Sequence, residues 1–171
     1  MRADGTIGVR VGKVELGQGI VTALAQIAAD ELGVALAAIR MLPAGPDGPD
    51  EGLTAGSLSI MDSGFALRLA AANVRARFTA AAGTPTFSYA ELARSVDLDV
   101  PAEPDVPLKS PGALVGRDVP RLDLPDKIFR RPRYIQDIRL PGQLFGRVIR
   151  PPSRGVKPGP RAEGLSEGQH F

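Results

Sequence analysis

The stretch TIGVRVGKVELGQGIVTALAQIAADELG, residues 6–33, decides the fold of the N-terminal part. In the first part of this stretch apolar residues alternate with other residues, and the alternation is interrupted once, near Gly12. This period of two predicts a strand over residues 6–16 that bulges or bends at the interruption. Gly17-Gln18-Gly19 then breaks the pattern. Over residues 20–32 apolar side chains recur at helical spacing, and Gly33 is a favourable stop, so the strand is expected to turn sharply into a helix.

A second strand and a second helix are predicted downstream. Residues 39–42 have a short strand pattern, and Pro43 to Gly52 must form a loop because this segment holds three Pro and three Gly. The helix is expected to begin near Ser59, where Asp62 three residues later resembles a capping box, and to end near Gly83. One apolar stripe supports this helix: Ile60, Gly64, Leu67, Ala71, Val74 and Phe78.

The C-terminal half is less regular. A short helix is predicted over residues 87–93, with the serine at its start as the cap. Residues 96–120 hold five Pro and little periodicity, which predicts an extended linker. Two strand-like segments, residues 134–140 and 143–150, flank Pro141-Gly142 and predict a hairpin.

These elements predict an α+β protein with four parts. Residues 1–83 are expected to form a strand-helix-strand-helix unit, and residues 84–120 a Pro-rich linker. Residues 121–152 would form a small hairpin-containing lobe, and residues 153–171 a disordered tail.

Composition argues against several classes of function. Cys is absent and the single His170 lies beside the C-terminus, so disulfides, thiolate metal sites and His-based catalysis are not expected. No apolar stretch approaches the roughly 20 residues of a membrane span. The N-terminus has no apolar signal segment, and a cytoplasmic location is therefore expected.

The net charge of +2 hides an uneven distribution. Residues 1–116 carry 9 basic and 13 acidic side chains, whereas residues 117–161 carry 12 basic and 4 acidic ones. A basic block of this kind is compatible with nucleic acid or with an acidic partner. Because its arginines lie within strand-like alternation beside Pro-Gly turns, nucleic-acid binding is not expected.

Gly17-Gln18-Gly19 is a candidate binding loop. Two glycines allow a sharp turn and a close approach to a ligand. The helix that follows directs unpaired N–H groups and the positive end of its dipole back at the turn. Gln18 adds an amide that both donates and accepts, so the loop suits a polar, phosphate-bearing heterocycle. The alternative is a strand-helix turn with a surface glutamine.

Thr54-Ala55-Gly56-Ser57-Leu58-Ser59 is a second candidate loop, with three hydroxyls and several small residues before another helix. The alternative is a serine cap among ordinary loop residues. A run of small residues before a predicted helix occurs twice, and the two occurrences together favour a ligand site more strongly than either one alone. Glu15, Asp50 and Glu51 are weaker candidates for acids or bases, because acidic loop residues are usually only solvated.

Residues 12–27 and 50–60 together resemble a known family, the molybdopterin-binding large subunits of xanthine dehydrogenase and aldehyde oxidase. The most similar branch contains isoquinoline 1-oxidoreductase and nicotinate dehydrogenase. Residues 115–150 resemble the entrance to that family's hammerhead-like α/β domain, including its Leu-Pro-Gly turn. The resemblance covers residues 3–155 and indicates an N-terminal fragment of such a subunit.

The resemblance implies a molybdenum-pyranopterin cofactor, as molybdopterin cytosine dinucleotide, bound once the rest of the subunit is present. The pterin dithiolene holds the metal, so no metal ligand is expected from the protein. The implied partners are the remaining large-subunit polypeptide and an iron–sulfur subunit. The implied reaction is oxidative hydroxylation of an N-heterocycle or aldehyde. The implied cofactor contacts are Gly17, Gln18 and Gly19 from one loop, and Thr54, Ala55, Gly56, Ser57 and Ser59 from the other.

The chain departs from the family in ways that bear on activity. It lacks the family's Gly-Glu motif, which supplies the carboxylate base, and the other glycine-rich cofactor loops. No catalytic residue is therefore assigned, and the chain is expected to be inactive alone. Arg130 stands where relatives favour a glycine. Two alternatives remain: a cofactor-free binding or scaffold module that retains a remnant of the fold, and an unrelated basic interaction protein.

Overall fold

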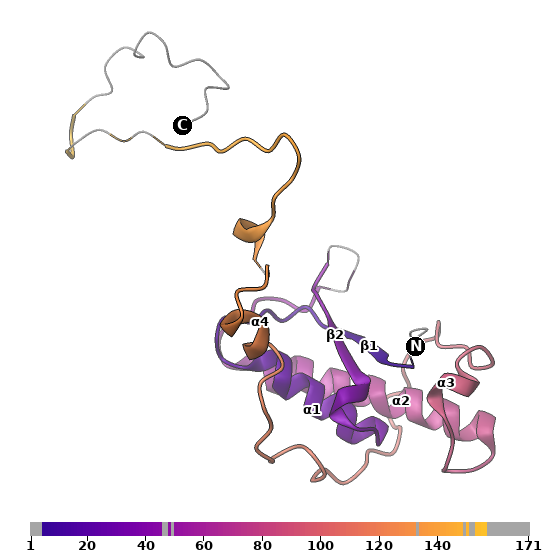
Figure 1. Cartoon of the computed structure of the whole chain (residues 1–171). Helices are drawn as coiled ribbons and strands as arrows, with labels where there is room; N and C mark the ends of the chain where they lie inside the picture. The colour runs from indigo at the N-terminus through magenta and orange to yellow at the C-terminus, as the bar shows by residue number, and fades with distance from the viewer. Residues whose placement is uncertain are drawn as a thin grey trace. The chain divides into compact units, whose positions relative to one another are not determined.

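The computed structural model describes residues 5–45, 48, 50–132, 134–148, 150 and 153–156. The chain divides into two compact units, Met1–Phe129 and Arg130–Phe171. In the first unit, strands β1 (Ile7–Arg10) and β2 (Ile39–Leu42) pair in parallel, and helix α1 (Ile20–Leu32) connects them (Figure 1). A short 3₁₀ turn, Leu36–Ala38, leads from α1 into β2. Mixed helix and strand agrees with the predicted α+β class.

Helix α1 has the predicted bounds, because its apolar spacing and the glycine that stops it are both local signals. Gly33 adopts a left-handed φ of 72° and its N–H caps the carbonyls of Ala29 and Asp30. The strand before it is shorter than the predicted 6–16. Pairing runs from Ile7 opposite Ile39 to Arg10 opposite Leu42 and stops where β2 ends. Beyond this point the chain bends at Gly12, as predicted, and bonds to another loop.

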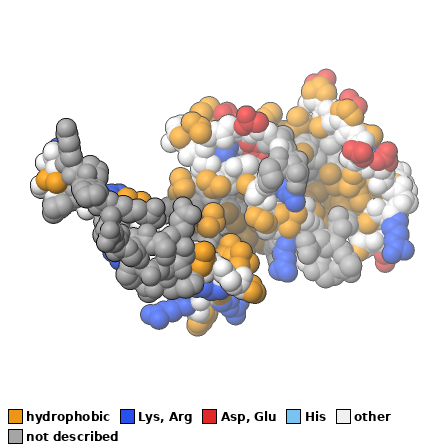
Figure 2. Space-filling view, turned by 90° about the horizontal axis from the view of Figure 1, so that it is seen from above, with side chains coloured by type: hydrophobic (Ala, Val, Ile, Leu, Met, Phe, Trp, Pro, Cys, Tyr) orange, Lys and Arg blue, Asp and Glu red, His pale blue; other side chains and the backbone are white. Residues whose placement is uncertain are grey.

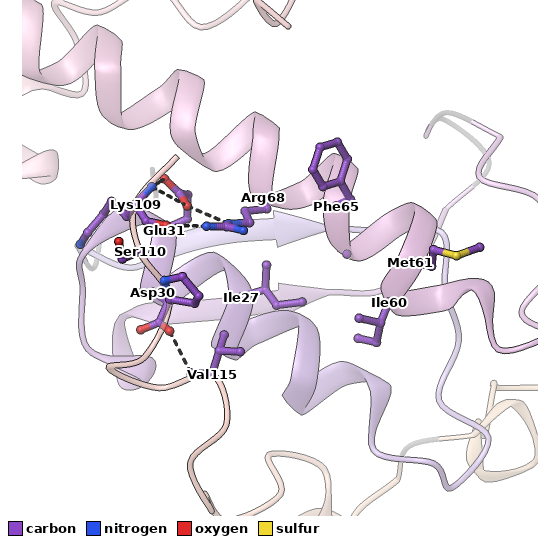
Figure 3. A pocket seen from close by; sticks show the side chains of 12 residues that line it. Ile27, Asp30, Glu31, Ile60, Met61, Phe65, Arg68, Lys109, Ser110 and Val115 are labelled. Carbon is purple, nitrogen blue, oxygen red and sulfur yellow. Dashed lines mark hydrogen bonds and ion pairs between the residues drawn. The ribbon is translucent and has the colours of Figure 1, made fainter. Parts of the chain in front are cut away.

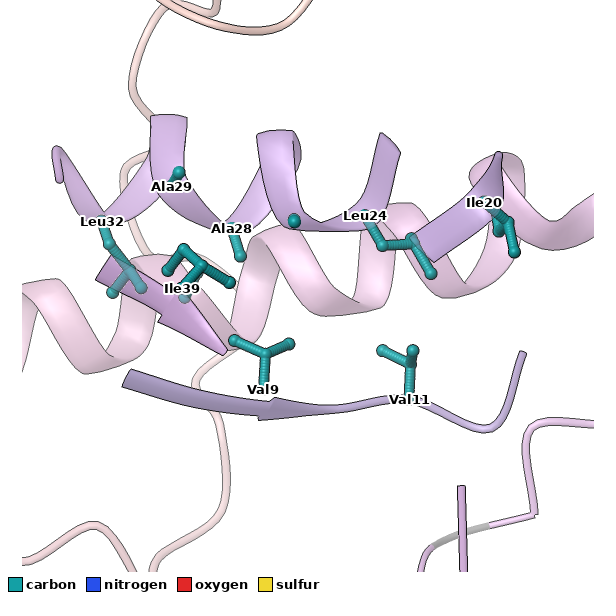
Figure 4. Close-up of a cluster of buried hydrophobic side chains, with 10 residues drawn as sticks. Val9, Val11, Ile20, Leu24, Ala28, Ala29, Leu32 and Ile39 are labelled. Atoms are coloured by element: carbon teal, nitrogen blue, oxygen red, sulfur yellow. The ribbon is translucent and has the colours of Figure 1, made fainter. Parts of the chain in front are cut away.

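The core lies between the two strands and α1, with helix α2 (Phe65–Ala82) packed against α1 (Figure 4). Val9 and Val11 on the strand side face Leu24 of α1. Small side chains at the core positions of both helices allow their backbones to approach closely. The buried apolar residues are Val9, Val11, Ile20, Leu24, Ala25, Ala28, Ala29, Leu32, Ile39, Ala71, Ala72 and Phe78.

The start of the second helix corrects one prediction. Residues Ser59–Gly64 form a π-helix that continues into α2, and Leu58 occupies the cap position without a side-chain bond. The predicted Ser59 capping box is therefore wrong, because Ser59 lies inside the wider π turn. The end at Gly83 is confirmed, with a left-handed φ of 67°.

A short helix, α3 (Tyr89–Leu92), begins as predicted. The Ser88 hydroxyl accepts a hydrogen bond from the Glu91 N–H at 3.4 Å. The rings of Phe78 and Tyr89 lie 4.9 Å apart between centroids, which packs α3 against the end of α2. The Tyr89 hydroxyl donates to the Leu32 carbonyl, and burial raises the pKa of this phenol to about 12.

Residues 96–120 contain no helix or strand where the structure describes them, but they are anchored to α1 and α2. The Asn73 amide exchanges two hydrogen bonds with the Glu103 backbone. The Asp30 carboxylate accepts the N–H groups of Gly112, Leu114 and Val115. The predicted division at 83, 120 and 152 stays a prediction. The segment between the first two boundaries nevertheless has fixed contacts.

The Glu31 carboxylate, 2% exposed, joins three parts of this unit. It pairs with Arg75 at 2.9 Å and Arg68 at 3.1 Å, and it accepts the Lys109 N–H at 3.0 Å. Burial alone would raise its pKa. The Lys109 N–H and the two guanidinium groups outweigh burial and hold the pKa of Glu31 below its ordinary value.

The second unit corrects the predicted hairpin. Its described residues contain a 3₁₀ turn, Ile135–Asp137, and a turn in which the Gln143 N–H bonds the Leu140 carbonyl, but no strand. An isolated two-stranded hairpin is marginal in water, and Ile135 is 85% exposed, with little apolar burial to support pairing. Arg130 adopts a φ of 52°, in the left-handed region that favours glycine.

The predicted tail at 153–171 lies outside the described residues except for residues 153–156. Among the described helices, none has the length and apolar character needed to cross a membrane. A short helix, α4 (Leu124–Ile128), ends the first unit.

We predict that Glu31→Ala lowers the free energy of unfolding by about 3 kcal/mol, because it leaves two partly buried arginines without their shared counter-charge. Urea unfolding of the full chain measures this. Glu91→Ala, on the exposed side of α3, is the matched control and should change stability by less than about 0.5 kcal/mol. Equal effects of the two substitutions would show that Glu31 does not join these elements.

Candidate functional site

The two predicted loops lie side by side, because the segments before them are hydrogen-bonded together. The Gly12 N–H donates to Glu51 Oε1 at 2.6 Å, and the Val14 N–H donates to Thr54 Oγ1 at 3.0 Å. The ammonium of Lys13, itself buried, donates to the carbonyls of Glu51 and Leu53. A Cβ at Gly12 would approach the Glu51 Cβ to 3.0 Å, so this close contact favours glycine. The interruption of the strand pattern at Gly12 is the sequence signal of this close contact.

The two loops wall one hollow of about 450 Å³, which we call the loop pocket. Its volume falls in the roughly 300–1,000 Å³ range of small-molecule sites. All predicted site residues except Gly17 line it, although they come from segments some 40 residues apart. No lining side chain is charged. The lining consists of Leu16, Gln18, Gly19, Ile20, Ala23, Thr54, Ala55, Gly56, Ser57, Ser59 and Ile60.

The backbone of the Gly17–Gly19 loop is already paired within the protein, which differs from the expectation of unpaired N–H groups. Glu15 Oε1 accepts the N–H groups of Gly17 at 2.9 Å and Gly19 at 2.8 Å. Glu15 Oε2 accepts the Val21 N–H, in the first turn of α1, at 3.3 Å. Gly17 and Gly19 have left-handed φ values of 107° and 83°, which favour glycine at both positions.

The Gln18 amide also holds its own loop. Its Oε1 accepts the Leu16 N–H at 2.6 Å, and its Nε2 donates to the Val14 carbonyl at 3.0 Å. A carboxamide carries a second N–H and a second lone pair. Gln18 can therefore bond a ligand in the loop pocket while it keeps both loop contacts.

The second loop contains two consecutive left-handed residues, Gly56 with φ 64° and Ser57 with φ 59°. Leu58 N–H closes the turn on the Ala55 carbonyl. A serine in this region costs about 1 kcal/mol or more, and such residues often mark ligand sites. The small residues of this turn, Ala55, Gly56 and Ser57, line the loop pocket.

Sequence reasoning missed a charged cluster beside the first loop. The Arg121 guanidinium lies 3.2 Å from Glu15 Oε1, forms two bonds to the fully buried Asp123, and donates to the Gly17 carbonyl at 2.8 Å. Lys127 completes the cluster at 2.5 Å from Asp123. The bonds from Arg121 lower the pKa of Asp123 more than burial raises it, and Lys127 lowers it further. The pKa of Asp123 therefore lies well below its usual range. Glu15, treated above only as a weak acid–base candidate, is thus a structural carboxylate.

A second hollow of about 330 Å³ shares Ile60 with the loop pocket (Figure 3). Three of its charged side chains are engaged within the protein: Arg68 bonds Glu31, and Asp30 accepts backbone N–H groups. The remaining lining is largely apolar, with Phe65 and Met61 more than half exposed. Within the described residues no His, Cys, Asp or Glu cluster is able to hold a metal ion. We therefore take the loop pocket as the candidate site.

A strand-helix-strand unit with two small-residue loops around one pocket is a ligand-binding architecture, and sequence comparison identifies its class. The family model for the molybdopterin cofactor-binding domain matches residues 1–99. The chain belongs to this family.

A curated relative agrees. A nicotinate dehydrogenase subunit of Pseudomonas putida is 36% identical over 176 residues, which covers 89% of this chain and 15% of the relative. The match confirms the resemblance to the molybdopterin-binding subunits of the xanthine dehydrogenase family. The chain spans about 15% of the length of this relative.

We predict that Thr54→Val, which preserves side-chain shape but removes the acceptor for the Val14 N–H, weakens the junction of the two loops. Stability should fall by about 1 kcal/mol, and the Val14 amide should exchange faster with solvent. Amide hydrogen exchange followed by NMR measures both effects. Thr86→Val, at an exposed position outside the loops, is the control. Unchanged protection of Val14 would contradict the proposed junction.

Proposed function

We propose that the chain contributes the two pocket loops to a molybdenum-pyranopterin site in a molybdenum hydroxylase. The observation that carries the proposal is the convergence of residues 17–19 and 54–59 on one uncharged pocket in a member of the molybdopterin cofactor-binding family. The bound group would supply the redox centre, at which an N-heterocycle or aldehyde is hydroxylated. The chain's own residues would bind and orient the pterin part.

The lining of the loop pocket fits such a group. A pterin ring offers several donors and acceptors on an uncharged edge, and the pocket offers the Gln18 amide with the hydroxyls of Thr54, Ser57 and Ser59. The left-handed turn at Gly56 allows close approach of the backbone. Ile20 and Ala23 provide apolar contact for a ring face.

The proposal extends to partners that the chain requires. We infer that the remaining large-subunit polypeptide closes the site, that an iron–sulfur subunit accepts electrons, and that the cofactor carries cytosine dinucleotide. Residues 121–152 would belong to a hammerhead-like lobe of the assembled subunit. A cytoplasmic location remains part of the proposal. The rival function is a cofactor-free scaffold with the same fold.

The chain alone is expected to retain no stoichiometric molybdenum and to oxidise neither nicotinate nor aldehydes. Many of its pocket-lining residues are exposed, and the family's Gly-Glu base motif is absent from this sequence. Metal analysis of the purified chain, with and without a co-expressed complementing large-subunit polypeptide, provides the measurement. Molybdenum that appears only in the complemented sample supports the cofactor role. Its absence from both samples favours the scaffold.

In the complemented sample, Gly56→Val should reduce molybdenum content several-fold. The new side chain would lie in a left-handed turn at the pocket, 3.6 Å from Leu58 Cγ. Gly83→Val is a matched control, because Gly83 has nearly the same φ but ends α2 outside the pocket. Gln18→Ala should also lower retention. Equal molybdenum loss in the Gly56 and Gly83 variants would mean that the effect is general destabilisation.

A further inference from the structure

The N-terminus of α1 and the Gly17–Gly19 loop form a cradle of N–H groups of the kind that binds anions. In this chain a carboxylate fills that cradle. Both oxygens of Glu15 are used, Oε1 by two loop N–H groups and Oε2 by the Val21 N–H. Burial alone would raise its pKa, but these backbone bonds hold the pKa of Glu15 below its ordinary value.

Arg121 fixes this carboxylate from a distant part of the chain. It bonds Glu15 with one nitrogen and the Gly17 carbonyl with another, so it holds both the carboxylate and the loop. Arg121 is itself held by the buried Asp123 through two bonds. The Leu122 N–H donates to the Thr22 hydroxyl of α1, which fastens the same segment to the helix.

The pocket residues lie next to this cradle but do not include it. Gln18 and Gly19 line the loop pocket, whereas Glu15 and Arg121 do not. The N–H groups that Glu15 accepts are therefore not offered to a ligand. A phosphate at this helix terminus would meet a negative charge that is already bonded there.

We propose that Glu15 is a positioning residue: it is the resident anion of the Gly17–Gly19 loop and, with Arg121, holds Gln18 and Gly19 against the loop pocket. The loop consequently presents an uncharged surface to the ligand and is not a phosphate cradle. The role of the loop toward a pterin rests on the proposed function. The identity of the resident anion does not.

Chemical rescue tests the proposal in the full chain without cofactor. Glu15→Ala vacates the cradle and leaves Arg121 beside it. We expect the variant to melt at lower temperature and to recover stability with millimolar formate or inorganic phosphate. Shifts of the Gly17, Gly19 and Val21 amide resonances should saturate with the same anion. The unsubstituted chain should show neither effect.

Glu15→Gln separates charge from shape. It fills the same volume but is neutral and presents an N–H₂ group to backbone donors, so it should lose stability without rescue by anions. A packing role alone would leave Glu15→Gln like the unsubstituted chain. Glu91→Ala, at an exposed glutamate, should show no anion dependence.

Two results would overturn the proposal: saturable phosphate shifts at these amides in the unsubstituted chain, or no anion response in Glu15→Ala. If Glu15→Ala does not fold, Arg121→Gln keeps the test open, because it retains the carboxylate and removes its counter-charge. The Gly19 amide should then exchange about tenfold faster, because Glu15 loses the charge-assisted bond from Arg121 that holds it against this amide. An unchanged rate would refute the role of Arg121. Since no readout involves the cofactor, the outcome is independent of whether the proposed function holds.

Discussion

The buried carboxylate of Glu31 is the contact on which the rest of the first unit depends. The core between α1 and α2 is built largely of alanine, which allows close packing but buries little apolar area per residue. Glu31 adds bonds from α1 to two arginines of α2 and to the backbone of residue 109. Without it, two guanidinium groups and a backbone N–H would lose a shared partner at the helix contact. Glu31 thus ties α1 to α2 and to residue 109, while Asn73 and Asp30 hold the segments on either side of that residue.

The same kind of contact, a carboxylate that accepts backbone N–H groups, recurs elsewhere in the described residues. Glu15, Asp30 and Glu31 each accept backbone N–H groups of irregular segments, which have no sheet partner to satisfy them. A chain with 20 Gly and 16 Pro forms few regular ladders, and these carboxylates replace part of that bonding. The irregular loops around the pocket are thus held by charge-assisted bonds, and each carboxyl has a lowered pKa. This contribution to stability is fully present above the carboxyl pKa of the unfolded chain, near 4, and is lost as pH falls through the lower folded values.

The features that sequence predicted correctly are local. Helix α1 follows from its apolar spacing and Gly33, and the cap of α3 follows from Ser88, because each signal lies within a few residues of its effect. The residues of the candidate site were named from their motifs and from resemblance, and the structure brings all but Gly17 to one pocket. The roles of Glu15 and Arg121 were not predictable, because their bond joins residues 106 positions apart and an acidic loop residue looks the same whether solvated or buried. The hairpin prediction failed for a related reason: an alternating pattern does not say whether a strand partner is present.

The exposed apolar side chains near the loop pocket bear on how a cofactor would be held. Hydrophobic side chains cover much of the described face in Figure 2, and Leu53, Met61 and Phe65 are each more than half exposed. Small-molecule sites bury most of their ligand's surface, roughly 70–90%. Many of the pocket-lining residues are themselves exposed, so the two loops enclose a ligand from one side. A pyranopterin in the loop pocket would thus leave part of its surface to water unless another polypeptide covered it. The same covering polypeptide would bury the apolar side chains around the rim. Both gains would come from one docking event, so cofactor binding and assembly are expected to stabilise each other.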